Sequence, residues 1–98
     1  MFATVFTYRA RPGEDDAVIA LHEDWQRRQS MNTGVYLAWM LLQNTQEPRE
    51  FIEITYFTSE DKARAASYDL NRDAWYTRLV SLLEAEPVCT HCSCAWTF

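Results

Sequence analysis

Residues 35–42 read VYLAWMLL, and this stretch decides which faces of the predicted β-sheet have to be buried. Turn signals on both sides and a length of eight residues favour a β-strand over a helix. Successive side chains of a strand point to opposite faces, and both faces of this strand are apolar. An antiparallel sheet with one face in water alternates apolar with polar residues. The stretch therefore predicts a sheet that is covered on both faces.

Three further strands are predicted, at residues 2–9, 51–57 and 88–98. Aromatic and β-branched residues are frequent in the first two, and the last alternates at period two. A polar turn at residues 44–48 joins the strand at 35–42 to the strand at 51–57, which predicts a hairpin.

Two helical regions are predicted. The first runs from residue 14 to about residue 30, with acidic residues in its first turn and arginines in its last. The second begins near residue 60, breaks near residues 69–71 and ends near residues 86–87. The apolar stripes at helical spacing are Val18, Leu21 and Trp25 in the first region, and Trp75, Leu79 and Leu82 in the last helix.

The element order βαββαβ predicts an α+β fold, a ferredoxin-like sandwich formed by a single domain over residues 1–98. Its four-stranded antiparallel sheet carries the helices on one face. Exposing about four large side chains on the other face, at roughly 1.5–3 kcal/mol each, rivals the stability of a whole domain. We therefore expect a homodimer through the sheet face, with residues 35–42 central to the contact.

Charge and composition exclude several classes of partner. Fourteen acidic and nine basic residues give a net charge of -5, and the basic residues are scattered, so nucleic acid is not an expected partner. The longest apolar run, residues 35–42, is too short to span a bilayer, and no leader segment is recognisable. Three cysteines within six residues are no disulfide framework. We expect a cytoplasmic protein that does not enter a membrane.

Three features of the chain resemble the antibiotic biosynthesis monooxygenase family of the dimeric α+β barrel superfamily. They are RPGED at residues 11–15 after the first strand, Gly34 before an apolar strand, and FIEITYFTSEDKA at residues 51–63. The likeness spans nearly the full length and rests on pattern and spacing. It implies a dimeric α+β barrel, in which the sheets of a homodimer face each other and each subunit has a cavity between sheet and helices.

The resemblance implies a cofactor-independent monooxygenase that acts on a small aromatic or quinone-like molecule in this cavity. The alternative is a non-catalytic homodimer of the same fold that binds a small apolar ligand or serves in a stress response. Several family members have a histidine in the helix after the third strand, but residues 63–69 contain none. His22 and His91 lie on other elements, so haem is not expected, and we expect no cofactor.

The candidate catalytic residues are Tyr56, Asn71 and Trp75, which would position and polarise the substrate. Phe57 is the other aromatic at the end of the third strand. The candidate substrate-binding residues are His22, Trp25, Tyr68, Arg72 and Tyr76.

Several candidates also have a structural interpretation. Tyr56 then packs in the barrel with its hydroxyl at the rim, and Asn71 caps a helix. His22 has an acidic residue on each of the next two positions, which is typical of a solvated helix face, although its ring suits a general base. Trp39 or Trp96 is a candidate anchor of the dimer.

The cysteine-rich segment at residues 89–94, CTHCSC, invites a metal interpretation because thiolates and imidazole bind zinc. In an extended strand Cys89 and His91 point one way, whereas Cys92 and Cys94 point the other. Four ligands then cannot converge, and no glycine or proline allows a turn. We expect no metal site here.

Overall fold

The structure, a computed structural model, describes residues 1–29, 38–67 and 70–97, with side chains described except at residues 29, 67 and 70–72. Residues 35–37 of the predicted second strand lie outside the described residues. None of the described helices is long and apolar enough to cross a membrane. The elements in chain order are β1 (Phe2–Arg9), α1 (Asp15–Gln29), β2 (Ala38–Gln43), β3 (Glu50–Phe57), α2 (Glu60–Ser67), α3 (Leu70–Ser81) and β4 (Val88–Ser93).

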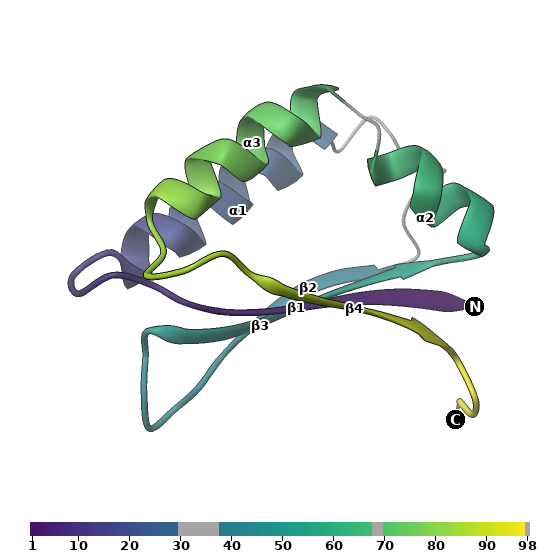
Figure 1. The fold of residues 1–98 in the computed structure, drawn as a ribbon, viewed down its shortest axis with the longest axis horizontal. Helices are drawn as coiled ribbons and strands as arrows, with labels where there is room; N and C mark the ends of the chain where they lie inside the picture. The colour runs from purple at the N-terminus through teal and green to yellow at the C-terminus, as the bar shows by residue number, and fades with distance from the viewer. Residues whose placement is uncertain (30–37, 68–69, 98) are drawn as a thin grey trace.

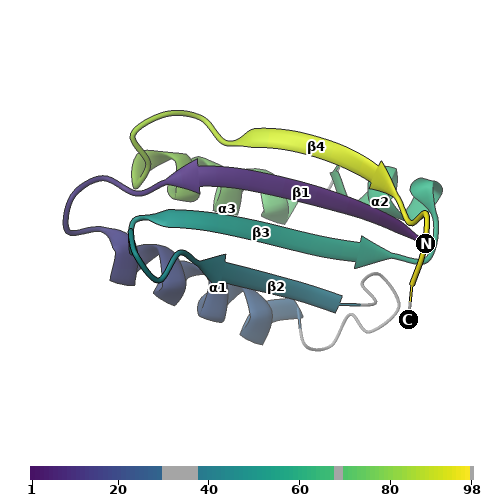
Figure 2. The same cartoon turned by 90° about the horizontal axis from the view of Figure 1, so that it is seen from below.

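The four strands form one antiparallel sheet in the order β2-β3-β1-β4. The three helices lie together on one face of this sheet, and no described helix covers the other (Figure 1, Figure 2). Right-handed crossovers account for this arrangement, because they bring both helical segments to the same side. The predicted ferredoxin-like α+β sandwich is confirmed.

The helix-facing side of the sheet packs against the apolar stripes of α1 and α3. Strand β3 shows the alternation clearly, because every second residue from Phe51 to Phe57 is buried. The stripe predicted for the first helix is buried as expected, and so are Trp75 and Leu79 of α3. The buried members of the main core are Tyr8, Ala10, Val18, Leu21, Trp25, Phe51, Trp75, Leu79 and Leu83.

Helix α3 ends at Ser81, five residues before the predicted end near residue 86. Its last turn tightens, because the amide of Leu82 bonds the carbonyl of Leu79 at 2.9 Å. The chain after it then pairs with the end of β1: Leu83 bridges Ala10, and the amide of Glu84 bonds the carbonyl of Arg9 at 3.0 Å. These backbone bonds replace the next helical turn.

Strand β4 ends at Ser93, so the prediction of a strand to residue 98 was too long. Among the described strands it pairs with β1, from Phe2 to Thr7. The amide of Cys94 bonds the carbonyl of Met1 at 2.9 Å, just after the last paired residue of β4. Residues 94–97 belong to no described strand.

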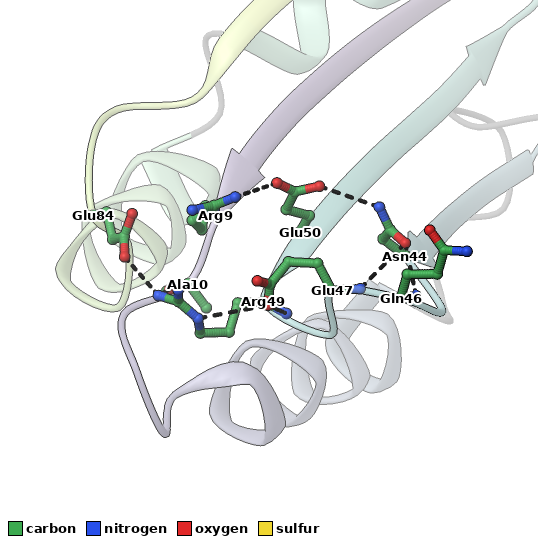
Figure 3. A network of polar contacts seen from close by, with 8 residues as sticks. All are labelled: Arg9, Ala10, Asn44, Gln46, Glu47, Arg49, Glu50 and Glu84. Carbon is green, nitrogen blue, oxygen red and sulfur yellow. Dashed lines mark hydrogen bonds and ion pairs between the residues drawn. The ribbon is translucent and has the colours of Figure 1, made fainter.

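A polar network joins the end of β1 to the β2–β3 hairpin and to the chain after α3 (Figure 3). Glu50 accepts hydrogen bonds from Arg9 and, at 3.2 Å, from Asn44. The hydrogen bond from Arg9 holds the pKa of Glu50 below its ordinary value. Arg49 donates to the Glu84 carboxylate at 2.6 Å and to the carbonyl of Ala10 at 3.2 Å. Most of these groups are exposed, so the network orients the loops more than it stabilises the fold.

Candidate functional site

A cavity of about 640 Å³ lies between the helix-facing side of the sheet and the helices. Its volume falls within the range of about 300–1,000 Å³ that is typical of small-molecule sites. The sheet contributes polar and aromatic side chains, and α2 contributes two small ones. The described wall residues are Phe2, Thr4, Phe6, Trp25, Trp39, Glu53, Thr55, Phe57, Glu60, Ala63, Arg64, Ala66, Asp73, Trp75, Tyr76, Cys89 and His91.

Three tryptophans from three elements meet at one side of this cavity. The ring of Trp75 lies 5.5 Å from that of Trp25 and 6.2 Å from that of Trp39, measured between centroids. The ring of His22 meets Trp75 edge to face at 5.0 Å. The indole Nε1 of Trp75 donates to the carbonyl of Leu21 at 3.2 Å, which fixes its orientation. Such clusters offer flat apolar surfaces of the kind that bind aromatic ligands.

A buried carboxylate, Glu53 of β3, stands beside the tryptophans. Its Oε1 accepts the hydroxyl of Tyr8 at 2.9 Å and lies 2.8 Å from Nε2 of His22. Its Oε2 accepts the indole Nε1 of Trp39 at 3.1 Å. Glu53 as a whole residue is 5% exposed, yet it lines the cavity. Four elements, β1, α1, β2 and β3, thus contribute to one polar cluster.

The hydrogen bonds of His22 determine how many protons this cluster holds. Its Nδ1 lies 2.8 Å from the carbonyl of Val18, which can only accept, so Nδ1 carries a hydrogen. Nε2 lies 3.0 Å from the Tyr8 hydroxyl and 2.8 Å from Oε1 of Glu53, and the closer contact needs a proton on one of its two atoms. The pair is neutral overall in either case, as an imidazolium–carboxylate or as an imidazole–carboxylic acid. The cluster stores one proton that two groups share.

Tyr8 supports the cluster as a hydrogen-bond donor. Burial raises the pKa of the Tyr8 hydroxyl, and the negative charge of Glu53 raises it further. The hydroxyl therefore stays protonated at neutral pH and keeps its bond to Oε1 of Glu53. Tyr8 as a whole residue is 7% exposed, so the residue that donates this bond is buried.

The structure brings several of the predicted site residues to the cavity. Trp25, Trp75 and Tyr76 line it. His22 stands behind Glu53 and is 6% exposed, so the interpretation of a solvated helix face is wrong. The physical reason is helical spacing: position 22 falls between Leu21 and Trp25 on the buried stripe of α1.

Tyr56 does not line the cavity. Its register partners are Ala3 and Ala38, and these residues alternate with the helix-facing ones. The expectation that Tyr56 acts in the cavity is therefore corrected, since Phe57, its neighbour, lines the wall instead. Tyr68 lies outside the described residues, and the side chains of Asn71 and Arg72 are not described.

Three residues of the cluster were missed by the sequence analysis or given another role. Glu53 is the one charged residue within residues 51–57, and a carboxylate in such an apolar strand is a signal of a buried polar site. Tyr8 shares the period of Phe2, Thr4 and Phe6 and carried no separate signal. Trp39 faces the helices and lines the cavity, so it does not lie on the open face as a dimer anchor would.

In the cysteine-rich strand, Cys89 and His91 share one face and Cys92 lies on the other, as the alternation predicted. Cys89 and His91 line the cavity wall, with Sγ 3.8 Å from Nε2, whereas Cys92 alternates to the other face opposite Ala3. Within residues 1–29, 38–67 and 70–97, no three His, Cys, Asp or Glu residues are placed to hold a metal ion.

Comparison with known proteins places the fold. No family model and no curated protein matches the sequence, but 50 chains of solved structures match the structure. A protein named "antibiotic biosynthesis monooxygenase" is 12% identical with a TM-score of 0.82, and the match covers 97% of this chain and 99% of that chain. The "putative antibiotic biosynthesis monooxygenase" of Nitrosomonas europaea is 12% identical with a TM-score of 0.84, covering 98% of this chain and 100% of that chain.

A protein of the same name from Caulobacter crescentus CB15 is 14% identical with a TM-score of 0.85, covering 97% of this chain and 90% of that chain. The chain has the antibiotic biosynthesis monooxygenase fold. Identities of this size establish the antibiotic biosynthesis monooxygenase fold alone, and a shared fold does not define an activity. Function has to be argued from the cavity and its cluster.

Proposed function

We propose that this chain is a cofactor-independent monooxygenase-like protein that acts on a small aromatic or quinone-like molecule. The observation that carries the proposal is the cavity in which a buried carboxylate, Glu53, stands beside three tryptophans. Flat apolar walls select an aromatic ring, and one polar group orients it. The shared fold with proteins named antibiotic biosynthesis monooxygenases supports the same class of reaction.

A hydroquinone can supply every electron that such a reaction needs. One hydroquinone and one dioxygen give a hydroxyquinone and water, so two electrons go to each oxygen atom and no further reductant is required. The protein then has to hold the ring, exclude bulk water and move protons. The cavity supports the first two tasks through its aromatic wall, and the Glu53–His22 pair supports the third.

Filling the cavity tests this proposal. Ala66 on α2 lines the cavity, and Ala66→Leu adds three carbon atoms to that wall. We expect the affinity for a naphthohydroquinone, measured by quenching of tryptophan fluorescence, to fall at least about tenfold, which corresponds to about 1.4 kcal/mol. Oxygen uptake with the same compound should fall in parallel.

Ala65→Leu is the matched control, because Ala65 lies on the same helix but is exposed and does not line the cavity. It should leave affinity and oxygen uptake unchanged. Equal affinities for both variants would place the ligand elsewhere and contradict the proposal. Saturable binding without oxygen uptake would instead indicate the non-catalytic ligand-binding protein.

We also propose that the open face of the sheet pairs with the same face of a second copy. Large apolar side chains lie exposed there on three strands, with exposed fractions of 39% for Met40, 46% for Leu42, 43% for Ile52 and 65% for Val88. The helices occupy the other face, so no described element of the same chain covers them. A sheet-to-sheet contact between two identical faces buries them with two-fold symmetry.

Ile52→Lys should convert the dimer to a monomer, because a lysine at the centre of a paired apolar face carries its charge into the contact. Sedimentation velocity at micromolar concentration measures the change. Ala65→Lys, on the exposed side of α2, is the control and should remain dimeric. A wild-type protein that sediments as a monomer would contradict the proposal.

A further inference from the structure

Building on the proposed function, we propose that Oε2 of Glu53 is the proton acceptor of the cavity and that its ligands are aromatic hydroxyl compounds such as phenols and hydroquinones. The proton leaves the ligand hydroxyl and binds Oε2, while the electron pair of the O–H bond stays on the ligand oxygen. The product of this step is a bound phenolate. A hydroquinone deprotonated in this way is the more electron-rich form that dioxygen can oxidise.

The two carboxylate oxygens of Glu53 differ in how many hydrogen bonds they accept, and Oε2 accepts fewer than Oε1. Each carboxylate oxygen has two lone-pair positions. Oε1 meets both the hydroxyl of Tyr8 and Nε2 of His22, at 2.9 and 2.8 Å, so its positions are filled. Oε2 meets the indole of Trp39 at 3.1 Å, and among the described residues no second donor reaches it. Because Glu53 and Trp39 both line the cavity, a ligand there can approach this remaining position.

The charge of the cluster favours the transfer. The Glu53–His22 pair is neutral with its one shared proton, and a second proton gives it a single positive charge. That charge forms next to the new phenolate, so the transfer creates an ion pair and leaves no isolated buried charge. Without His22, protonation of Glu53 would give only a neutral carboxylic acid. The phenolate would then have no positively charged partner.

Other titratable groups also face the cavity, and the experiment has to separate them from Glu53. Arg64 of α2 is engaged with Glu60 of the same helix at 2.8 Å. The titratable groups of the cavity wall other than Glu53 are Glu60 and Arg64 of α2, Asp73 and Tyr76 of α3, and Cys89 and His91 of β4. In the described part of the chain, none of these side chains is hydrogen-bonded to Glu53.

The test uses 4-nitrophenol, whose phenolate is yellow and whose neutral form is not. A spectrophotometric pH titration of the protein-bound dye should show phenolate formation about one pH unit lower than for the free dye, a tenfold change in the ratio of the two forms. Glu53→Gln keeps the shape of the side chain but cannot take up the proton, so the titration should return to that of the free dye or move higher. Saturable binding of 4-nitroanisole, which has no proton to give, by both proteins would show that the cavity of Glu53→Gln is intact.

His22→Gln provides a second and independent variant. It leaves Glu53 in place but removes the ring that carries the additional charge, so bound phenolate should form at higher pH than in the wild type. Equal titrations in the wild type, Glu53→Gln and His22→Gln would overturn the inference and leave the proposed function standing. Failure of both nitro compounds to bind the wild type would overturn the proposed function and this inference together.

Discussion

His22→Leu should lower the free energy of unfolding by about 3–5 kcal/mol, because it leaves the carboxylate of Glu53 buried without its main partner. Both side chains are almost fully buried, with exposed fractions of 7% for His22 and 6% for Glu53, and their contact is 2.8 Å long. Such a loss is a large share of the stability of a domain of this size. Urea denaturation followed by circular dichroism measures it.

His91→Leu is the matched control, since His91 is the other histidine and is exposed. It should change the free energy of unfolding by no more than about 0.5 kcal/mol. A similar loss in both variants would show that the buried pair is not the cause.

The triple variant with Tyr8→Phe, His22→Leu and Glu53→Leu removes the ionisable groups of the cluster, leaves Trp39 in place and puts apolar groups of comparable volume in their positions. It should recover most of the stability that His22→Leu loses, because no buried charge remains unpaired. If the triple variant is as unstable as the single one, the loss comes from shape and not from charge. If stability is recovered, the cluster is retained for its chemistry and not for its contribution to folding.

Trp75→Ala is expected to be equally costly, at about 3–5 kcal/mol, because it removes a large buried ring from the centre of the core. The ring is 7% exposed and contacts the rings of Trp25, Trp39 and His22. The carbonyl of Leu21 also loses the indole donor that it bonds at 3.2 Å. Guanidinium denaturation is the measurement.

Trp96→Ala controls for the loss of a tryptophan as such, since Trp96 is 78% exposed. Trp96→Ala should change the free energy of unfolding of the isolated subunit by no more than about 0.5 kcal/mol. A loss below about 1 kcal/mol for Trp75→Ala would show that the cavity wall rearranges around the missing ring. The tryptophan cluster would then not be the rigid wall on which ligand binding depends.

The two faces of the sheet have different proposed roles. The helix-facing side holds the cavity and the Glu53 cluster, and the open side holds the apolar residues that we propose meet a second copy. Substitutions on one face should therefore leave the readout of the other unchanged. Ile52 and Glu53 are adjacent in β3 and face opposite ways, which makes them the sharpest pair for that comparison.

Local periodicity in the sequence determined the elements and their order. Strand β1 runs from Phe2 to Arg9, and the first helix presents its stripe of Val18, Leu21 and Trp25, both as predicted. These features depend on residues a few positions apart, so a window of sequence contains all the information that they need. The helix end that was wrong, at residue 81, was set by backbone partners far away in the chain.

The tertiary structure alone decided which face of the sheet carries the site. The sequence placed Glu53 and Tyr56 on opposite faces of one strand, but both faces of the sheet are apolar, so the pattern does not say which one turns to the helices. Packing against α1 selected the face with Glu53. Its partners His22 and Tyr8 lie 31 and 45 positions away in the chain, a distance that no local pattern spans. Strand register and helix packing bring them together, because a shift of one residue would turn the carboxylate to the other face.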